Sequence, residues 1–441
     1  MKTLELFPAS ARLDENGQLW LGGCPVSSLA EEFGTPLYVF DEATLRGRCR
    51  EYRQALKRHY PGAGRVAYAS KAYLNLALAQ LFDQEGLSLD VVSGGELYVA
   101  QRAGFPPRQI HFHGNNKAPA ELAMALDMGV GRIVVDNFYE MDTLERLAQE
   151  RRVEEVPIWL RLSPGIDVHT HAYRKTGLLD SKFGFPLQTG NAERALARAL
   201  ASPHLIPAGL HAHIGSQIHD LEPFAVTIAI LLEFAATMGE RHGFELREFS
   251  PGGGWGVTYH ESDTPVPLER YVQTVCKAVV EGCRRHGLEL PALVIEPGRS
   301  IVAPAAVALY RVGARKEIPG VRTYISVDGG MADNIRPALY GARYTALVAN
   351  KADRPTEEMV TVAGRFCESG DVLIRDVALP RLEAGDLLAV PGAGAYCLAL
   401  AGNYNLVPRP AVVLVGDGKA GLMQRRETFD DLMARDLPLP V

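Results

Sequence analysis

An alternation of short apolar runs and helical segments between Arg65 and Ser300 constrains the fold of this sequence most. The runs are rich in β-branched residues, and the segments between them have the spacing of amphipathic helices. Strands that are apolar on both faces and separated by helices form a parallel sheet, and eight of them favour a closed (β/α)8 TIM-like barrel. The eight predicted strands are Val66–Ser70, Leu89–Ser93, Ile110–His113, Arg132–Asp136, Pro157–Leu162, Ala208–Ile214, Leu246–Ser250 and Ala292–Glu296.

The pattern changes after about Ser300, where strands follow one another through Gly, Pro and Asp turns with little helix between them. This predicts a separate β domain, a β-sandwich or a β-barrel. Its predicted strands are Val307–Val312, Thr323–Val327, Glu358–Val362, Asp386–Val390 and Ala411–Val415. We expect the barrel over residues 36–300 and the β domain over residues 301–441. Residues 1–35, with Gln18–Leu21 as a candidate extra strand, are expected to pack with the β domain.

The composition excludes several classes of function. A chain of 441 residues is long enough for two cores. Its net charge of -6 disfavours nucleic acid and anionic membranes as partners. Met1 to Arg12 show no export signal, and no apolar run approaches the roughly 18 residues of a membrane span. The six cysteines form no Cys-x-x-Cys pair, which a disulfide framework or a zinc site would favour. We expect a cytoplasmic enzyme without a bound metal.

Chemically useful residues follow four of the predicted barrel strands at their carboxyl ends, where α/β barrels carry their active sites. Each is ordinary alone, as a surface lysine, a core histidine, a tight turn or an exposed ion pair. Together they match what pyridoxal phosphate needs: a lysine for an imine, a carboxylate beside the pyridine nitrogen, and backbone or hydroxyl donors for the phosphate. These residues are Lys71, His211 and His213 with Ser216, Gly252-Gly253-Gly254, and Glu296-Pro297-Gly298-Arg299.

A series of motifs from Phe33 to Asn405 gives nearly the whole sequence a family resemblance. The chain resembles the fold-type III pyridoxal-phosphate decarboxylases, and among them the members that convert meso-2,6-diaminopimelate to L-lysine and carbon dioxide. The motifs are Tyr68-Ala69-Ser70-Lys71-Ala72, Asp90-Val91-Val92-Ser93-Gly94-Gly95-Glu96, His111-Phe112-His113-Gly114-Asn115-Asn116-Lys117, Ser181-Lys182-Phe183-Gly184-Phe185, His213-Ile214-Gly215-Ser216-Gln217 and Glu296-Pro297-Gly298-Arg299.

The resemblance implies roles for the barrel residues. Lys71 would form the imine with the cofactor, and His213 would stack on its ring. Glu296 would pair with the pyridinium nitrogen, so that the ring accepts the electrons that remain when carbon dioxide departs. The remaining residues would hold the phosphate. These are Ser216, Gly253, Gly254, Gly298 and Arg299.

The resemblance also implies substrate contacts from the β domain. Arg336 and Tyr340, in Arg336-Pro337-Ala338-Leu339-Tyr340, would bind substrate together with Arg299, because an Arg fork suits a carboxylate. Tyr396 would touch both cofactor and substrate. Cys367 would donate a proton and Glu368 would contact the distal amine, both from the neighbouring subunit, which implies a homodimer with shared active sites.

Three alternative functions compete with this interpretation. His-x-His occurs at 111/113, 169/171 and 211/213, as in barrel metallohydrolases, but the first strand here ends in Lys71. A catalytically silent cofactor carrier would lack the β domain. A sister decarboxylase acting on ornithine, lysine, arginine or carboxynorspermidine would leave Arg336 without a carboxylate, and a buried unpaired Arg is costly. Tyr73 departs from the Asn of many relatives, and His169 and His171 receive no role.

Overall fold

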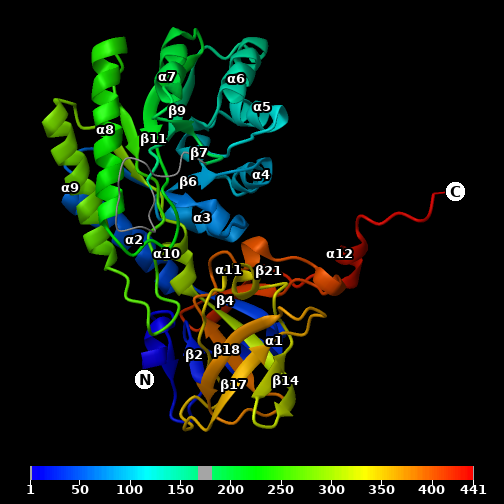
Figure 1. Cartoon of the computed structure of the whole chain (residues 1–441). Coiled ribbons are helices and arrows are strands. Elements are labelled where there is room, and N and C mark those ends of the chain that lie inside the picture. The colour runs from blue at the N-terminus through cyan, green and yellow to red at the C-terminus, as the bar shows by residue number, and fades with distance from the viewer. Residues whose placement is uncertain (1, 167–180, 441) are drawn as a thin grey trace. The chain divides into compact units, whose positions relative to one another are not determined.

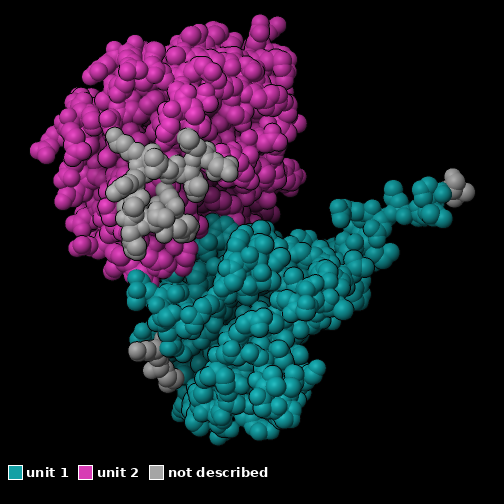
Figure 2. Space-filling view, viewed as in Figure 1, with its two compact units in different colours: residues 1–48, 257–264, 299–441 teal, residues 49–256, 265–298 magenta. Residues whose placement is uncertain are grey.

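The computed structural model describes residues 2–166 and 181–440. The chain divides into two compact units, which Figure 2 colours separately. The barrel unit comprises Cys49–Gly256 and Pro265–Gly298, and the β unit comprises Met1–Arg48, Val257–Thr264 and Arg299–Val441. His169 and His171, to which the sequence assigned no role, lie outside the described residues.

Eight parallel strands close on themselves in the barrel unit, in the order β9-β11-β12-β13-β5-β6-β7-β8 and back to β9. Each predicted barrel run overlaps one of them, so the predicted (β/α)8 barrel is confirmed. The two-residue β10 (Phe185–Pro186) adds to β9. The barrel strands are β5 (Gly64–Ala69), β6 (Ser88–Val91), β7 (Ile110–Phe112), β8 (Arg132–Val135), β9 (Val156–Ser163), β11 (Leu205–His211), β12 (Glu248–Ser250) and β13 (Ala292–Ile295).

Helices lie outside these strands in Figure 1. Their starts and ends follow local sequence signals: Asn75, Ser93 and Asn137 accept a hydrogen bond from the first turn, and glycines in the left-handed region end three of the helices. The helices are α2 (Glu42–His59), α3 (Leu76–Gln84), α4 (Gly94–Arg102), α5 (Pro119–Met128), α6 (Phe138–Arg151), α7 (Asn191–Ala201), α8 (Glu222–His242) and α9 (Leu268–His286), with short 3-10 turns η2 (Ser70–Ala72) and η3 (Pro107–Gln109).

Helix α8 is, by length and composition, long and apolar enough to cross a membrane, with a mean hydropathy of 1.4. The sequence predicted no membrane-spanning segment. The apolar face of α8 is buried within the barrel unit, where the ring of Phe224 lies 5.0 Å from that of Tyr271 in α9. Leu232 packs so closely on Gly282 of α9 that a Cβ there would meet its side chain at 2.4 Å. Helix α8 therefore packs its apolar face into the core of the barrel unit.

The β unit is built on a mixed sheet in the order β18-β17-β15-β14-β4-β20-β21, with β19 on β14 and β16 on β19. All five predicted strands of the β domain are present. The strands are β4 (Leu37–Asp41), β14 (Ala306–Ile318), β15 (Arg322–Val327), β16 (Leu347–Val348), β17 (Glu358–Ala363), β18 (Val372–Leu379), β19 (Leu387–Pro391), β20 (Ala411–Gly416) and β21 (Lys419–Gln424). The helices and 3-10 turns are η1 (Lys2–Leu6), α1 (Val26–Phe33), α10 (Arg299–Val302), η4 (Ala303–Ala305), α11 (Arg336–Tyr340), η5 (Leu398–Leu400), η6 (Tyr404–Leu406) and α12 (Phe429–Met433).

The N-terminal chain differs from its predicted place. Strand β4, which lies within the residues predicted for the barrel, pairs antiparallel with β14 and parallel with β20 in the β unit. All five of its residues are buried, so its own pattern does not reveal which sheet receives it. Gln18–Leu21 overlaps β2 (Leu19–Leu21), which pairs with β1 (Arg12–Leu13) and β3 (Cys24–Pro25) in a separate three-stranded sheet. Leu19 and Leu21 share a core cluster with Leu37 and Val39 of β4.

Candidate active site

Four neighbouring barrel strands place the predicted cofactor residues at one rim. Lys71 follows β5 in the turn η2, Glu296 follows β13, the glycine turn at 252–254 follows β12, and His213 follows β11. Because β11, β12, β13 and β5 are adjacent in the sheet, their carboxyl ends lie side by side. The structure therefore brings these predicted residues together.

Glu296 lies close to several polar side chains at this rim. It is 5% exposed, and its carboxylate lies 2.9 Å from His211 Nε2 and accepts a hydrogen bond of 2.9 Å from the Ser250 hydroxyl. His113 Nε2 lies 3.6 Å from the same carboxylate. Burial raises the pKa of Glu296. A buried carboxylate with a raised pKa is stabilised by a nearby cation, so these surroundings fit a protonated pyridine nitrogen.

Asp90 and His113 belong to the same buried cluster, although the sequence analysis gave them no role. Asp90 Oδ1 lies 3.7 Å from His113 Nε2, and neither atom has a hydrogen-bond partner among the described residues. Burial, followed by the charge of Glu296, raises the pKa of Asp90 to about 7, while Lys71 and Arg161 act in the opposite direction. Their positions at the carboxyl ends of β6 and β7 were the signal that could have found them.

The glycine turns bring backbone close to backbone. A Cβ on Gly253 would lie 1.9 Å from the carbonyl oxygen of Glu296, and one on Gly254 would lie 2.1 Å from that of Gly215. Gly254 also has a φ of +105°. The Gly253 N–H donates to His213 Nδ1 at 3.4 Å, which ties the turn to the predicted ring-stacking histidine. A surface of this kind, without side chains, lets backbone N–H groups approach a phosphate. Ser216, which follows Gly215 directly, is exposed to solvent.

The β unit contributes a second group of predicted residues. Arg336, at the first position of α11, is 6% exposed, and its guanidinium lies 4.2 Å from the ring centre of Tyr259 and donates to the Tyr344 hydroxyl. Arg299 donates to the Tyr259 hydroxyl at 2.8 Å and lies 4.7 Å from the ring centre of Tyr396. Tyr259 therefore contacts both arginines. Its role could not be predicted from the sequence, because a lone Tyr after a glycine turn belongs to no motif.

Tyr396 reaches Arg299 through a close backbone approach. A Cβ on Gly394 would lie 1.8 Å from the carbonyl oxygen of Val302, so only glycine lets this turn sit on α10, the helix that begins with Arg299. Tyr396 itself adopts a left-handed φ of +59°. Backbone strain of this kind persists only where the surroundings enforce it.

Three other predicted substrate residues are exposed to solvent. Tyr340 is 65% exposed at the end of α11. Cys367 and Glu368 are exposed in the loop between β17 and β18. That loop is held in place because Cys367 N–H donates to Asn405 Oδ1 at 2.9 Å and its carbonyl accepts from the Tyr404 hydroxyl at 3.1 Å. Among the described residues, no hydrogen bond or ion pair joins Cys367 or Glu368 to Arg336.

One cluster among the described residues has metal-ligand geometry. His113, His211 and Glu296 offer ligand atoms that all lie within 4.8 Å of one another. The two histidines come from different His-x-His pairs, on β7 and β11, rather than from a single strand. The arrangement differs from the first-strand pair that barrel metallohydrolases use.

Comparisons with known proteins agree with this geometry. The family model "Pyridoxal-dependent decarboxylase, pyridoxal binding domain" matches residues 42–303. Diaminopimelate decarboxylase from Bacillus subtilis is 48% identical over 432 residues, covering 97% of each chain. The enzyme of that name from Synechocystis is 46% identical, covering 98% of this chain and 92% of its own. A crystal structure of diaminopimelate decarboxylase from M. jannaschii in complex with L-lysine has a TM-score of 0.91, 35% identity and 98% coverage of both chains.

The closed barrel, its rim and the family model together define a fold-type III pyridoxal-phosphate-dependent decarboxylase. The two bacterial relatives match over almost their full length at 46% and 48% identity. The chain belongs to the diaminopimelate decarboxylase family.

Proposed function

We propose that this enzyme decarboxylates meso-2,6-diaminopimelate to L-lysine and carbon dioxide with pyridoxal phosphate as cofactor. The observation that carries the choice of substrate is Arg336. Its guanidinium is buried against tyrosine rings, and within residues 2–166 and 181–440 it forms no ion pair with a carboxylate. A buried guanidinium without an anion is costly, so the site favours a substrate that supplies one. Diaminopimelate has a second carboxylate, whereas lysine does not.

The barrel residues fit the cofactor. Lys71 would hold it covalently, and Gly253, Gly254, Gly298, Ser216 and the backbone of Arg299 would bind its phosphate. When bound, the cofactor supplies an electron sink for the electrons left by the departing carboxylate. Glu296 would keep the ring nitrogen protonated, and His211 and Ser250 fix the orientation of that carboxylate. His213 would cover one face of the ring.

The β-unit residues would select and protonate the substrate. Arg299 and Arg336 would each take a carboxylate, since a guanidinium fork donates two parallel hydrogen bonds. Tyr340 and Tyr396 would line the substrate, Glu368 would bind its distal amine, and Cys367 would return a proton after carbon dioxide leaves. The exposure of Cys367 and Glu368 in an anchored loop supports their use in a partner's site. The enzyme would then be a homodimer with shared active sites.

A cytoplasmic location completes the proposal. All six cysteines are free, and five of them are buried thiols. Free thiols of this kind are usual in a reducing compartment. Lysine as the product assigns the enzyme to lysine biosynthesis.

Release of carbon dioxide tests the proposal directly. We expect release from meso-diaminopimelate by the purified, cofactor-loaded enzyme and none above background from L-lysine or L-ornithine. Comparable turnover of L-lysine would favour a sister decarboxylase. Activity that depended on added zinc and not on pyridoxal phosphate would favour the metal cluster of His113, His211 and Glu296 instead.

A further inference from the structure

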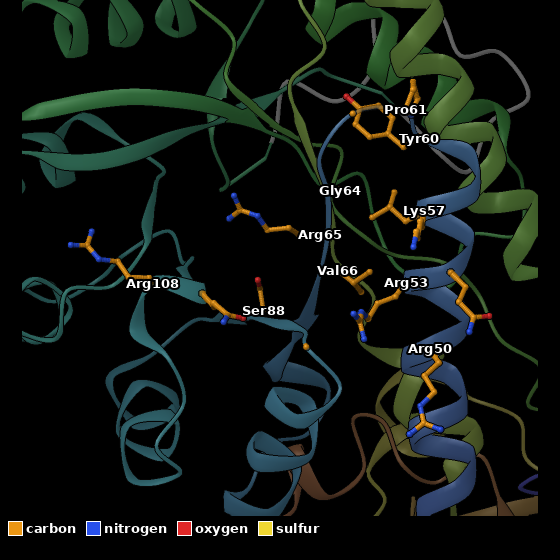
Figure 3. Close-up of a pocket in the computed structure, with 15 residues that line it drawn as sticks. Arg50, Arg53, Lys57, Tyr60, Pro61, Gly64, Arg65, Val66, Ser88 and Arg108 are labelled. Carbon is orange, nitrogen blue, oxygen red and sulfur yellow. The ribbon is translucent and has the colours of Figure 1, made fainter.

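A second hollow lies at the amino ends of the barrel strands. It has a volume of about 970 Å³ and is lined by α2, by residues 60–62 and 64–66, by Gly86 and Ser88, and by Arg108 and Gln109 (Figure 3). Strand β5 starts at this pocket with Gly64 and ends at Ala69, just before Lys71. The pocket and the proposed active site are therefore at opposite ends of the same strand.

The lining of this pocket is strongly basic. Five of its 15 residues are cationic and none is acidic, although the whole chain carries a net charge of -6. The cationic residues are Arg50, Arg53, Lys57, Arg65 and Arg108.

Nearby acids neutralise only part of this charge. Arg50 forms a two-point ion pair with Glu85, with both distances at 2.8 Å. Arg65 lies 3.7 Å from Glu248, which is already bound to Arg132. Arg53 donates to the backbone carbonyl of Glu85 at 2.7 Å. This bond does not neutralise the guanidinium charge.

The two remaining cations, Lys57 and Arg108, form no ion pair within the described part of the chain. They lie on opposite sides of the pocket in Figure 3. Both are exposed and able to turn toward a bound anion.

Ser88 provides an independent sign of a ligand. Its side chain is only 3% exposed and lines the pocket, yet its hydroxyl makes no hydrogen bond to any of the described residues. In Figure 3 this hydroxyl points toward the space beside Arg65. A hydroxyl with little exposure and no protein partner is available to donate to, or accept from, a ligand atom at this position.

We infer that this pocket binds a small phosphate-bearing anion. Guanidinium forks and an ammonium group match the several oxygens of a phosphate, and the Ser88 hydroxyl adds a donor. A free oligophosphate and the phosphate chain of a nucleotide share this chemistry. The aromatic residue of the lining, Tyr60, is buried and donates its hydroxyl to Pro291, so it offers no face for a base. The pocket therefore favours a free oligophosphate.

Calorimetric titration of the cofactor-loaded enzyme with pyrophosphate at low salt tests the assignment. We expect saturable binding and a higher unfolding temperature, because a ligand that binds only the folded state stabilises it. Lys57→Gln with Arg108→Gln should weaken binding at least about tenfold, since charge-assisted hydrogen bonds are lost. Ser88→Ala should weaken it by a smaller factor.

Arg284→Gln with Arg285→Gln is the matched control. It removes the same charge from exposed positions near the end of α9, outside the pocket, and should leave pyrophosphate affinity unchanged within about twofold. Equal losses in both double variants would reduce the effect to overall charge and overturn the site. Binding that survives in the pocket variant would place the anion elsewhere. A clear preference for ATP over pyrophosphate would overturn the assignment to a free oligophosphate.

Discussion

The two units carry their candidate residues in different ways. In the barrel unit, Glu296, Asp90, His113 and His211 are buried side by side at the ends of regular strands, and burial raises the pKa of the two carboxyl groups and lowers that of the two imidazoles. In the β unit, Arg299 and Arg336 are held by tyrosine rings on short helices and irregular turns, and Cys367 and Glu368 are exposed. A closed barrel can prearrange a charged cluster within one unit. The β unit instead offers separate groups whose roles depend on what binds to them.

The contrast predicts that the barrel residues, together with the proton donor Cys367, decide whether chemistry occurs, whereas the arginines and tyrosines of the β unit decide on which substrate. Lys71→Ala should therefore have the largest effect. Without the amine that holds the cofactor, turnover should fall on the order of a thousandfold or more. Borohydride reduction of the wild type followed by mass spectrometry should find the cofactor on the Lys71 peptide. A label on another lysine, or none, would remove the central assignment.

Mixing variants of the two units sharpens the comparison. If Cys367 acts in the partner's site, then Lys71→Ala and Cys367→Ala should each be nearly inactive alone but complement each other. Statistical reassociation gives half heterodimers, each with one intact site of two, so activity should recover to about a quarter of wild type. No recovery, in the presence of verified heterodimers, would mean that each site is built within one chain.

Glu296→Gln should come next in magnitude. The neutral amide would no longer stabilise a protonated ring nitrogen, and groups of this kind contribute about 2.7–4 kcal/mol, or roughly a hundredfold to a thousandfold in kcat. Its absorbance spectrum should still show bound cofactor, because the lysine and the glycine turns are intact. Unchanged turnover would show that Glu296 does not face the ring nitrogen.

Arg336→Gln should act on substrate binding rather than on chemistry. Loss of a charge-assisted bond of about 1.5–3 kcal/mol predicts a rise in KM for meso-diaminopimelate of roughly tenfold to a hundredfold, with a smaller change in kcat. Arg375→Gln, at an exposed position in β18, is the control and should leave KM unchanged. A selective fall in kcat with normal KM would show that Arg336 acts in the chemical step rather than in substrate binding.

Tyr259 gives the smallest predicted effect. Tyr259→Phe removes the 2.8 Å hydrogen bond to Arg299 but keeps the ring against Arg336, whereas Tyr259→Leu removes both contacts. A typical intramolecular hydrogen bond contributes about 0.5–1.5 kcal/mol net, and Arg299 keeps its charge, so KM should rise about twofold to tenfold in the Phe variant and further in the Leu variant. Identical values for the two variants would show that the ring face does not orient Arg336.

The sequence alone determined the parts of this protein that depend on local pattern. Runs such as Val66–Ser70 and Arg132–Asp136 predict buried strands, since a short apolar stretch between two helices is typical of a strand in a parallel sheet. Strand ends then predicted that Lys71, His213, the glycine turn and Glu296 would share one rim, because parallel strands end together. Periodicity did not reveal that β4 joins the β unit, because strand pairing is a long-range choice between sheets that accept the same apolar run.

Only the tertiary structure decided the contacts between residues that no motif connects. Residues 257–264 leave the barrel unit, and with them Tyr259 comes to lie between Arg299 and Arg336. Asp90 and His113 come to lie 3.7 Å apart in one buried cluster, and cations from α2, β5 and η3 line a pocket at the far end of the strands. Distances and burial set these energies, and neither is a property of neighbouring positions in the chain.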